Sequence, residues 1–400
     1  MKKSYLFLVL LAALSFSCNN DDDTQVDEPV VIVPGEEEQP GEEQPAECLY
    51  YNGDAILTTQ AEVDAFGANH YCGVMGNFYI GSQNGVSNIT SLEPLKDIVT
   101  ATGTGFTFTI KNNPNLVSLE GLHNVANVSK VLIENNASLL NLQGLRALTN
   151  FDEYGTLRIN NNASLQNLTG LEAITKMREL LVTNNPALIS CIGLKNCTEF
   201  GQLTISSSPQ IATLDGITAA TIEDLSLKDL GVASLSVLNG LTEADYISIE
   251  FLPNLTTLQG LEGLISVSGV SVRNNAGLTS LYGLQNLTGN VNSLVIEGNN
   301  ALVSIEHLLG VTSITNTLNG TNYLGGLTLR NNASLISLNG LQNVAQFSGN
   351  LYITQNNALK NLCALQSILI NKTSNSYVSV YDNLNPVTPT DIIAGNCSID

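Results

Sequence analysis

The chain has 400 residues, with 36 acidic and 15 basic side chains, and its formal net charge at pH 7 is −21. An acidic surface repels nucleic acid and anionic lipid, so the charge argues against both as direct partners. Charged residues make up only 13% of the chain, which leaves Asn, Ser and Thr to make the surface of the folded part polar.

Residues 1–17 are typical of an export signal. Lys2 and Lys3 precede an apolar stretch, residues 5–14, that is too short to cross a bilayer as a mature helix. The stretch leads to Cys18 and the run Asn-Asn-Asp-Asp-Asp, a pattern that resembles a bacterial lipoprotein signal of the kind used for surface export in Bacteroidetes. The resemblance implies an outer-membrane lipoprotein that faces the cell exterior, with lipid at Cys18 as its only membrane contact. The alternative is an ordinary secretory signal with an incidental cysteine.

Residues 18–47 are expected to form a disordered tether. Between residues 19 and 47 there are eleven acidic residues, four prolines and no Lys or Arg. Such a segment buries too little apolar surface to order itself, and its charges hold it extended. Its apolar run at residues 30–33, Val-Val-Ile-Val, is the one place expected to dock transiently.

A repeated phrase, close to Leu-x-Ile-x-Asn-Asn-x-x-Leu-x-x-Leu-x-Gly-Leu, occupies residues 78–383. Thirteen copies follow one another from Ile80 to Val380 at a mean spacing of 25 residues. A fixed period of this size marks a solenoid, in which each turn buries its apolar side chains only against its neighbours. Within a copy, apolar-x-apolar predicts a short strand, Asn-Asn a corner, and the Gly a bend on the return path. Residues 48–77 and 384–400 are then the N-terminal and C-terminal caps that cover the ends of the core.

The phrase Asn-Asn-Pro-Asn-Leu-Val-Ser-Leu-Glu-Gly-Leu at residues 112–122 resembles the receptor L-domain type of leucine-rich repeat. The resemblance recurs through most of residues 78–383 and implies a mainly β, right-handed leucine-rich-repeat solenoid of about 13 turns with disulfide-bonded caps. It says little about a ligand, because fold alone does not determine function.

The asparagine pairs fall into two columns along the predicted stack. We interpret them as a structural ladder, with each amide bonded to the backbone of its own or the next turn, rather than as a sugar- or ion-binding face. The pattern breaks at Ser207, Asp229 and Phe251, so the middle turns are expected to have a different corner. The first column consists of Asn112, Asn135, Asn161, Asn184, Asn274 and Asn331, and the residue after each belongs to the second.

The outward residue after each strand forms another column. Its charges alternate in sign, which we interpret as a self-neutralising ladder that fixes register rather than as a docking strip. The alternating members are Lys228, Glu250, Arg273, Glu297 and Arg330.

The candidate ligand-binding residues gather near the C-terminal end. An exposed aromatic patch is expected from three tyrosines on adjacent strands, Tyr352, Tyr377 and Tyr381. Arg330, which falls in the same outward column as Tyr381, is a further candidate. The insertion at residues 313–326, which contains Tyr323, leaves the stack two turns earlier and is expected to overhang the patch. The alternative is that these rings only shield the last turns.

Six cysteines besides Cys18 form three neighbouring pairs. Because turns of a solenoid contact only their neighbours, bridges Cys48–Cys72 and Cys363–Cys397 would close the two caps, and Cys191–Cys197 would close a loop within one turn. Sequence alone proves none of these pairings, and free buried thiols are the alternative.

No catalytic, metal-binding or cofactor-binding motif appears in the sequence. The three histidines, His70, His123 and His307, fall in different turns. We therefore expect a non-catalytic recognition or adhesion protein that binds a protein, peptide or glycan at the cell surface and does not bind nucleic acid. One alternative is a structural or accessory envelope protein that partners other outer-membrane components. A weaker alternative is a hydrolase that acts on surface polymers.

Overall fold

The computed structural model describes residues 48–315 and 325–399. They belong to one compact unit, Cys48–Asp400. Cys18, the apolar run at residues 30–33 and Tyr323 lie outside the described residues, and what was expected of them stays a prediction.

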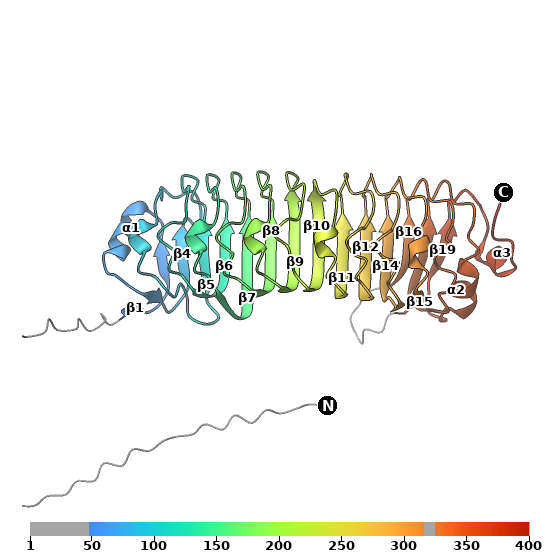
Figure 1. The fold of residues 1–400 in the computed structure, drawn as a ribbon, viewed down its shortest axis with the longest axis horizontal. Helices are drawn as coiled ribbons and strands as arrows, with labels where there is room; N and C mark the ends of the chain where they lie inside the picture. The colour runs from blue at the N-terminus through green and yellow to red at the C-terminus, as the bar shows by residue number, and fades with distance from the viewer. Residues whose placement is uncertain (1–47, 316–324, 400) are drawn as a thin grey trace, which may run out of the picture. The chain divides into compact units, whose positions relative to one another are not determined.

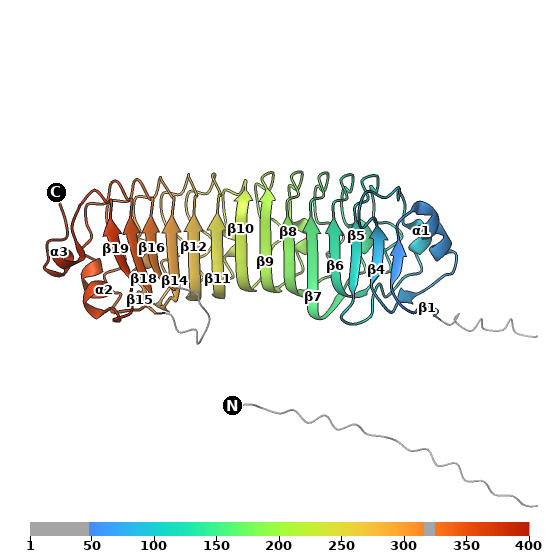
Figure 2. The same cartoon turned by 180° about the vertical axis from the view of Figure 1, so that it is seen from behind.

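A parallel sheet runs the length of this unit (Figures 1 and 2). Its 14 strands pair in chain order, as a solenoid requires, with each strand beside the strand of the preceding and following turn. The strands are β2 (Ala55–Leu57), β4 (Phe78–Gly81), β5 (Thr107–Lys111), β6 (Asn127–Glu134), β7 (Asn150–Asn160), β8 (Lys176–Thr183), β9 (Glu199–Ser208), β10 (Thr221–Leu230), β11 (Glu243–Glu250), β12 (Ser266–Arg273), β14 (Ser293–Glu297), β16 (Gly326–Arg330), β18 (Asn350–Thr354) and β19 (Val378–Tyr381).

The predicted solenoid is therefore present, with one strand more than the thirteen copies expected. The additional strand is β2, which lies in the segment assigned to the N-terminal cap and pairs with β4 through Leu57 and Ile80. Its sequence, Ala-Ile-Leu, is followed neither by an Asn-Asn corner nor by the Leu-x-Gly-Leu part of the phrase, so the repeat phrase does not reveal it.

The inward positions of the strands build one continuous core. Ile110 pairs with Ile133 in register, Ile133 pairs with Ile159, and all three side chains are fully buried. Because successive residues of a strand point to opposite faces, the apolar-x-apolar pattern directs two side chains per turn into this core. Stacking then buries each of them against the same position in the turns before and after.

The return path supplies the opposite wall of the core. Leu116, Leu119 and Leu122 are fully buried there, as are their counterparts in most turns. Gly121 adopts a φ of +104°, and a Cβ at this position would lie 1.9 Å from the carbonyl oxygen of Leu92 in the preceding turn. The glycine of the repeat is thus required by the close approach of two turns. Short 3₁₀ helices occur along this wall: η1 (Glu93–Leu95), η2 (Gln143–Leu145), η3 (Ile192–Leu194), η4 (Ser236–Leu238) and η5 (Glu306–Leu308).

Two small parallel sheets lie beside the main one. One pairs β1 (Tyr50–Tyr51) with β3 (Gly73–Val74), and the other joins β13 (Gly289–Asn290), β15 (Val311–Ile314) and β17 (Gln346–Phe347).

The N-terminal end of the core is covered by α1 (Gln60–Gly67). Thr59 caps this helix: its side chain accepts a hydrogen bond from the backbone N–H of Glu62. In return, the backbone N–H of Thr59 donates to the carboxylate of Glu62. Phe66 on the buried face of α1 stacks on Phe78, with ring centroids 5.8 Å apart. The disulfide Cys48–Cys72 closes this end, as predicted.

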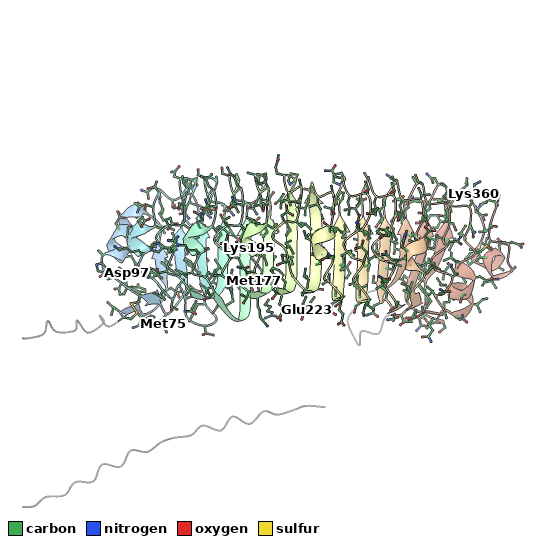
Figure 3. The ribbon with its side chains drawn as sticks, viewed as in Figure 1. Met75, Asp97, Met177, Lys195, Glu223 and Lys360 are labelled. Atoms are coloured by element: carbon green, nitrogen blue, oxygen red, sulfur yellow. A yellow bond between two sulfur atoms is a disulfide. The ribbon has the colours of Figure 1, made fainter. Side chains whose placement is uncertain are left out.

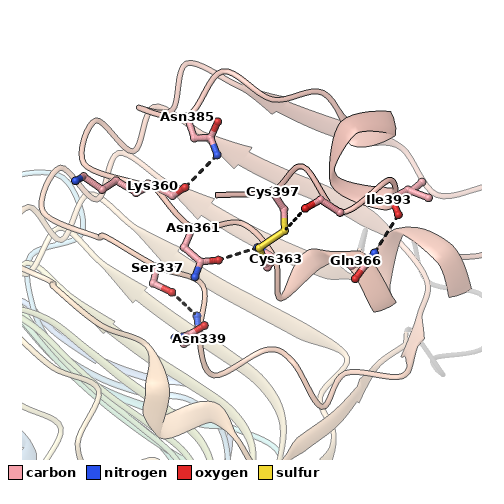
Figure 4. Close-up of a disulfide and its surroundings, with 10 residues drawn as sticks. Ser337, Asn339, Lys360, Asn361, Cys363, Gln366, Asn385, Ile393 and Cys397 are labelled. Atoms are coloured by element: carbon pink, nitrogen blue, oxygen red, sulfur yellow. Dashed lines mark hydrogen bonds between the residues drawn. A yellow bond between two sulfur atoms is a disulfide. The ribbon is translucent and has the colours of Figure 1, made fainter. Parts of the chain in front are cut away.

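The C-terminal end contains α2 (Leu365–Asn371), α3 (Pro389–Ile393) and the predicted disulfide Cys363–Cys397, whose Cα atoms lie 4.9 Å apart. Figure 4 shows the surroundings of this disulfide, where Gln366 Nε2 of α2 donates to the carbonyl oxygen of Ile393 at 3.0 Å. The bridge and this bond fasten the last segment of the chain to the return path.

The predicted bridge between Cys191 and Cys197 is wrong. Both thiols are free and fully buried. Cys191 precedes η3 and Cys197 follows it, and each occupies a position that carries a buried apolar residue, Leu168 or Ile174, in the preceding turn. The two side chains therefore replace core residues in two different columns instead of facing each other.

The corners after the main-sheet strands from β5 to β19 all have a left-handed backbone conformation. The first-column asparagines have φ between 55° and 59°, in the left-handed region. Ser207, Asp229 and Phe251 have φ of 49°, 54° and 54°, so the expectation of a different corner in the middle turns is wrong for the backbone. Asparagine favours this conformation, but stacking imposes it on the other residues as well.

Candidate functional site

The two asparagine columns have different environments. Asn113, Asn136 and Asn162, which belong to the second column, are fully buried. Asn136 accepts from Asn113 Nδ2 at 3.0 Å and donates through its own Nδ2 to the carbonyl oxygen of Ile110, also at 3.0 Å. The hydrogen-bonded ladder therefore runs through the second column, whose asparagines from Asn113 to Asn356 are fully buried and out of reach of a ligand.

The first column lies outside that ladder. Asn184 Nδ2 donates to Asn161 Oδ1, and Asn135 Nδ2 donates to Asn112 Oδ1 at 2.8 Å, so parts of it are linked as well. Asn161 and Asn184 are exposed, unlike the residues that follow them. The sequence predicted a ladder in both columns. The repeated amide-to-amide bonds lie in the second column, and the main contribution of the first column is the left-handed corner.

The outward charged column forms a chain of ion pairs. Glu250 lies 3.6 Å from Lys228 and 3.7 Å from Arg273, and Glu297 lies 3.8 Å from Arg273 and 4.0 Å from Arg330. The charges of neighbouring strands in this column thus neutralise one another. Because these side chains are paired with one another, the column from Lys228 to Arg330 does not present a surface of a single charge to a charged ligand.

The three predicted tyrosines are divided between two places on the sheet. The rings of Tyr352 on β18 and Tyr377, directly before β19, lie 5.6 Å apart at an angle of 46°. Tyr381 is paired with Thr354 at the other end of β19, four residues beyond Tyr377 and thus about 13 Å away along the strand. Tyr377 and Tyr381 are 58% and 54% exposed. The predicted aromatic patch is therefore a contacting pair plus a separate exposed ring.

A polar hollow lies at the corners of the last turns. It has a volume of about 650 Å³ and is lined by Asn331, Gln355, Asn357, Asp382, Asn383 and Leu384. Arg330 is adjacent, and its Nε donates to Gln355 Oε1 at 2.9 Å. The repeat pattern did not predict this hollow, although one signal was present in the sequence: the corner column changes from asparagine to Gln355 and Asp382 in the last two turns.

A second hollow, of about 640 Å³, lies near the N-terminal end. Tyr50, Met75, Val128 and Phe151 provide its apolar lining, and Met75 is 47% exposed (Figure 3). It also includes residues of the longer loop between β4 and β5, such as Thr102. The 30-residue interval between Ile80 and Ile110 marked this loop in the sequence, but an interval alone does not say that the loop borders a hollow.

The described residues contain few arrangements of reactive side chains. Ser280 Oγ lies 3.4 Å from His307 Nδ1, while His70 pairs with Asp97 at 2.6 Å in a different turn. Burial raises the pKa of the Cys191 thiol to about 12 and that of Cys197 to about 11, which keeps both thiols protonated and poorly nucleophilic at neutral pH. Across residues 48–315 and 325–399, no three His, Cys, Asp or Glu side chains are grouped so that they could hold a metal ion.

Carboxylates gather on the outer face of β10 and β11. Burial raises the pKa of Asp224, and the nearby charges of Asp245 and Glu223 raise it further (Figure 3 labels Glu223). A raised pKa does not define a site by itself.

In the part of the chain that the structure describes, no helix has the length and apolar character needed to cross a membrane. No protein-family model and no curated protein matches the sequence of the chain.

Proposed function

We propose that the protein is a cell-surface, non-catalytic recognition or adhesion protein that binds a protein, peptide or glycan on the outer face of its last turns. The observation that carries the proposal is the contact between the partly exposed Tyr352 and the exposed Tyr377 on adjacent turns, with rings 5.6 Å apart. Aromatic rings held on a rigid sheet offer large contact area at little conformational cost.

The polar hollow beside Tyr381 supports the same location. Asn, Gln and Asp side chains line it, and such groups accept and donate hydrogen bonds to peptide amides or sugar hydroxyls. A ligand extending from Tyr377 to Tyr381 would contact aromatic rings at both ends of β19 and polar groups at the corner.

The wider assignment extends the same proposal. The chain is a leucine-rich-repeat solenoid of the receptor L-domain type, exported as a lipoprotein, anchored through Cys18 and held off the outer membrane by residues 19–47. The repeat phrase and the placement of its leucines in the core support the first part. The residue pattern around Cys18 supports the second.

The test begins with purified protein on glycan, peptide and protein arrays. For a ligand found there, Tyr352→Ala/Tyr377→Ala is expected to weaken binding at least tenfold, because exposed aromatic anchors dominate such interfaces. Tyr381→Ala tests the other end of β19 separately. The matched control is Tyr246→Ala, which removes a partly exposed ring from the same face of the sheet on β11.

Three outcomes distinguish the alternatives. Equal affinity of wild type and the double variant, with an unchanged unfolding midpoint, would remove the aromatic pair as the binding site. Co-purification with envelope proteins of the same cell, and no array ligand, would favour the accessory role. Turnover in a screen of surface polymers would favour a hydrolase.

A further inference from the structure

The two ends of the main sheet are covered to different extents. At the N-terminal edge the inward residues of β2, Ala55 and Leu57, are only 2% and 5% exposed. At the C-terminal edge the inward residues of β19, Val378 and Val380, remain half-buried, whereas Leu351 and Ile353 in the preceding strand are fully buried. The last strand therefore holds an incompletely covered part of the core.

The backbone of β19 is also unpaired on one side. Within residues 48–315 and 325–399, β19 pairs with β18 and is the last strand in the order of the sheet (Figure 1). Large apolar side chains are exposed around this end, among them Ile370 at 59%, Leu384 at 46% and Ile393 at 43%. A free strand edge beside exposed apolar groups favours the addition of another strand.

The chain contains one segment of matching length and character. Residues 30–33, Val-Val-Ile-Val, are four consecutive residues of high β propensity, and β19 is also four residues long. Pro29 and Pro34 bound the segment, and prolines at both ends suit an edge strand that accepts no further partner. In parallel register, the first and third residues of the segment would lie over Val378 and Val380 and complete their burial.

The distance to be bridged decides which copy donates the segment. β2 and β19 stand at opposite ends of a sheet of 14 strands, which corresponds to about 60 Å at the usual spacing of about 4.8 Å. The fifteen residues from Val33 to Cys48 span at most about 50 Å when fully extended. Cys48 is bonded to Cys72 at the N-terminal end, so the segment cannot reach β19 of its own chain.

We propose that residues 30–33 of one copy add as a parallel strand to β19 of a second copy, so that copies associate head to tail. Such a contact uses different surfaces on the two partners and leaves each copy with a free donor or acceptor, which allows chains of more than two copies. This assembly goes beyond the proposed recognition function and does not depend on it.

Cysteine cross-linking of the full-length protein tests the contact. Two differently tagged copies are co-expressed, one with Val31→Cys and the other with Ser379→Cys, the outward residue in the middle of β19. In the proposed register these residues are neighbours, and we expect a disulfide-linked species that carries both tags. The remaining free thiols of the described chain, Cys191 and Cys197, are buried and do not compete.

The matched control replaces Ser379→Cys with Ile56→Cys. Ile56 is the outward, 49% exposed residue in the middle of β2, the opposite edge strand. We expect at least tenfold less two-tag species with this control, and a similar loss when the donor copy also carries Ile32→Asp. A synthetic peptide with the sequence of residues 28–35, added in excess, should reduce cross-linking of the Val31→Cys and Ser379→Cys copies at least fivefold.

Two results would overturn the proposal. One is the absence of a two-tag species above the Ile56→Cys control. The other is an intramolecular disulfide in a single copy that carries both Val31→Cys and Ile56→Cys, which would place the segment on its own N-terminal edge. Cysteine copies that also carry Tyr352→Ala/Tyr377→Ala should cross-link as well as those without these changes. The cross-linking experiment therefore tests the assembly even if the recognition proposal fails.

Discussion

Turns near the two ends of the solenoid place a buried asparagine after the corner, whereas the turns of β10 and β11 place Leu230 and Leu252 there. The corner backbone is the same in both regions, because Asp229 and Phe251 adopt the left-handed conformation that asparagine adopts elsewhere. Stacking of the turns thus imposes the corner, and the side chain behind it can be either an amide within a ladder or an apolar group within the core.

The boundary between the two regions shows how they join. Asn185 donates its backbone N–H to Ser208 Oγ at 3.3 Å, which ends the first ladder, and the Leu252 N–H donates to Asn275 Oδ1 at 2.9 Å, which begins the second. Each amide thus serves the turn before it. A ladder can end at a turn where another group, such as Ser208 Oγ, accepts the N–H of the preceding turn. An asparagine inside the ladder cannot be removed without leaving the amide groups of the preceding turn without an acceptor.

The largest expected effect comes from converting a ladder turn to the composition of the middle turns. In Asn162→Leu, the N–H and Nδ2 groups of Asn136 lose their shared acceptor at 3.1 and 3.2 Å, and the carbonyl of Ile133 loses a donor at 3.0 Å. Buried groups without partners are costly, so we expect the free energy of unfolding to fall by about 3 kcal/mol. Urea unfolding followed by circular dichroism measures it.

The control for that variant is the neighbouring corner residue. Asn161→Gly keeps a residue that adopts the left-handed conformation freely and removes an exposed amide, whose hydrogen bond from Asn184 Nδ2 can be replaced by water. Its free energy of unfolding should stay within about 0.5 kcal/mol of wild type. Equal losses in the two variants would contradict the assignment of the ladder to the second column.

The next effect concerns the two buried thiols beside the middle turns. Burial raises the pKa of Cys191 to about 12 and that of Cys197 to about 11, from an ordinary value of 9.0. A raised pKa favours the folded state fully below the unfolded value, and this contribution is lost as pH rises from about 9 towards 11 and 12. At pH 10 we expect a loss of about 3 kcal/mol relative to pH 7, because each of the two thiols contributes about one pKa unit.

The thiol contribution is isolated by comparing unfolding midpoints at pH 7, 9 and 10 with those of Cys191→Ala/Cys197→Ala. That variant should show a smaller fall at alkaline pH. Identical pH profiles would contradict the burial of the thiols, and so would rapid alkylation of the folded protein at pH 7.

A smaller effect is expected from restoring asparagine at a middle corner. Phe251 has a φ of 54°, a conformation that is strained for an aromatic residue and tolerated by asparagine. Phe251→Asn should raise the free energy of unfolding by about 1 kcal/mol. The reciprocal variant Asn274→Phe, one turn later, should lower it by a similar amount, and no change in either would show that the corner carries no strain.

The smallest change in the free energy of unfolding is expected at the outward charged column. This column begins in the middle turns at Lys228 and continues to Arg330, beside the turns that contain the second ladder. Glu250→Gln removes the charge between Lys228 and Arg273 while keeping an acceptor for Ser248 Oγ. Because these ion pairs are partly exposed, we expect a loss of about 0.5 kcal/mol at low ionic strength and none in about 1 M salt. A loss that persists in high salt would mean that packing, not charge, holds the column.

Much of the architecture could be predicted because the same residue pattern recurs in each copy of the repeat. The inward positions of strands such as Val131 and Ile133 follow from alternation alone, and the cap disulfides follow from the rule that turns contact only their neighbours. β2 was missed because neither an Asn-Asn corner nor the Leu-x-Gly-Leu part of the phrase follows it.

The candidate site was less predictable. Tyr352 and Tyr377 come together because β18 and β19 pair in register, but the separation of Tyr381 depends on where along β19 each tyrosine falls. The polar hollow at Gln355 and Asp382 arises from the shape of the last corners, which residue spacing does not describe.

The sequence by itself determined the solenoid, its period and the apolar residues of its core, because these depend on short-range periodicity that every copy repeats. Only the tertiary structure decided which asparagine of each pair is buried, that Cys191 and Cys197 stay apart, and that β19 keeps a free edge. Adjacent residues of identical type can face opposite environments, so their roles depend on how neighbouring turns pack against them.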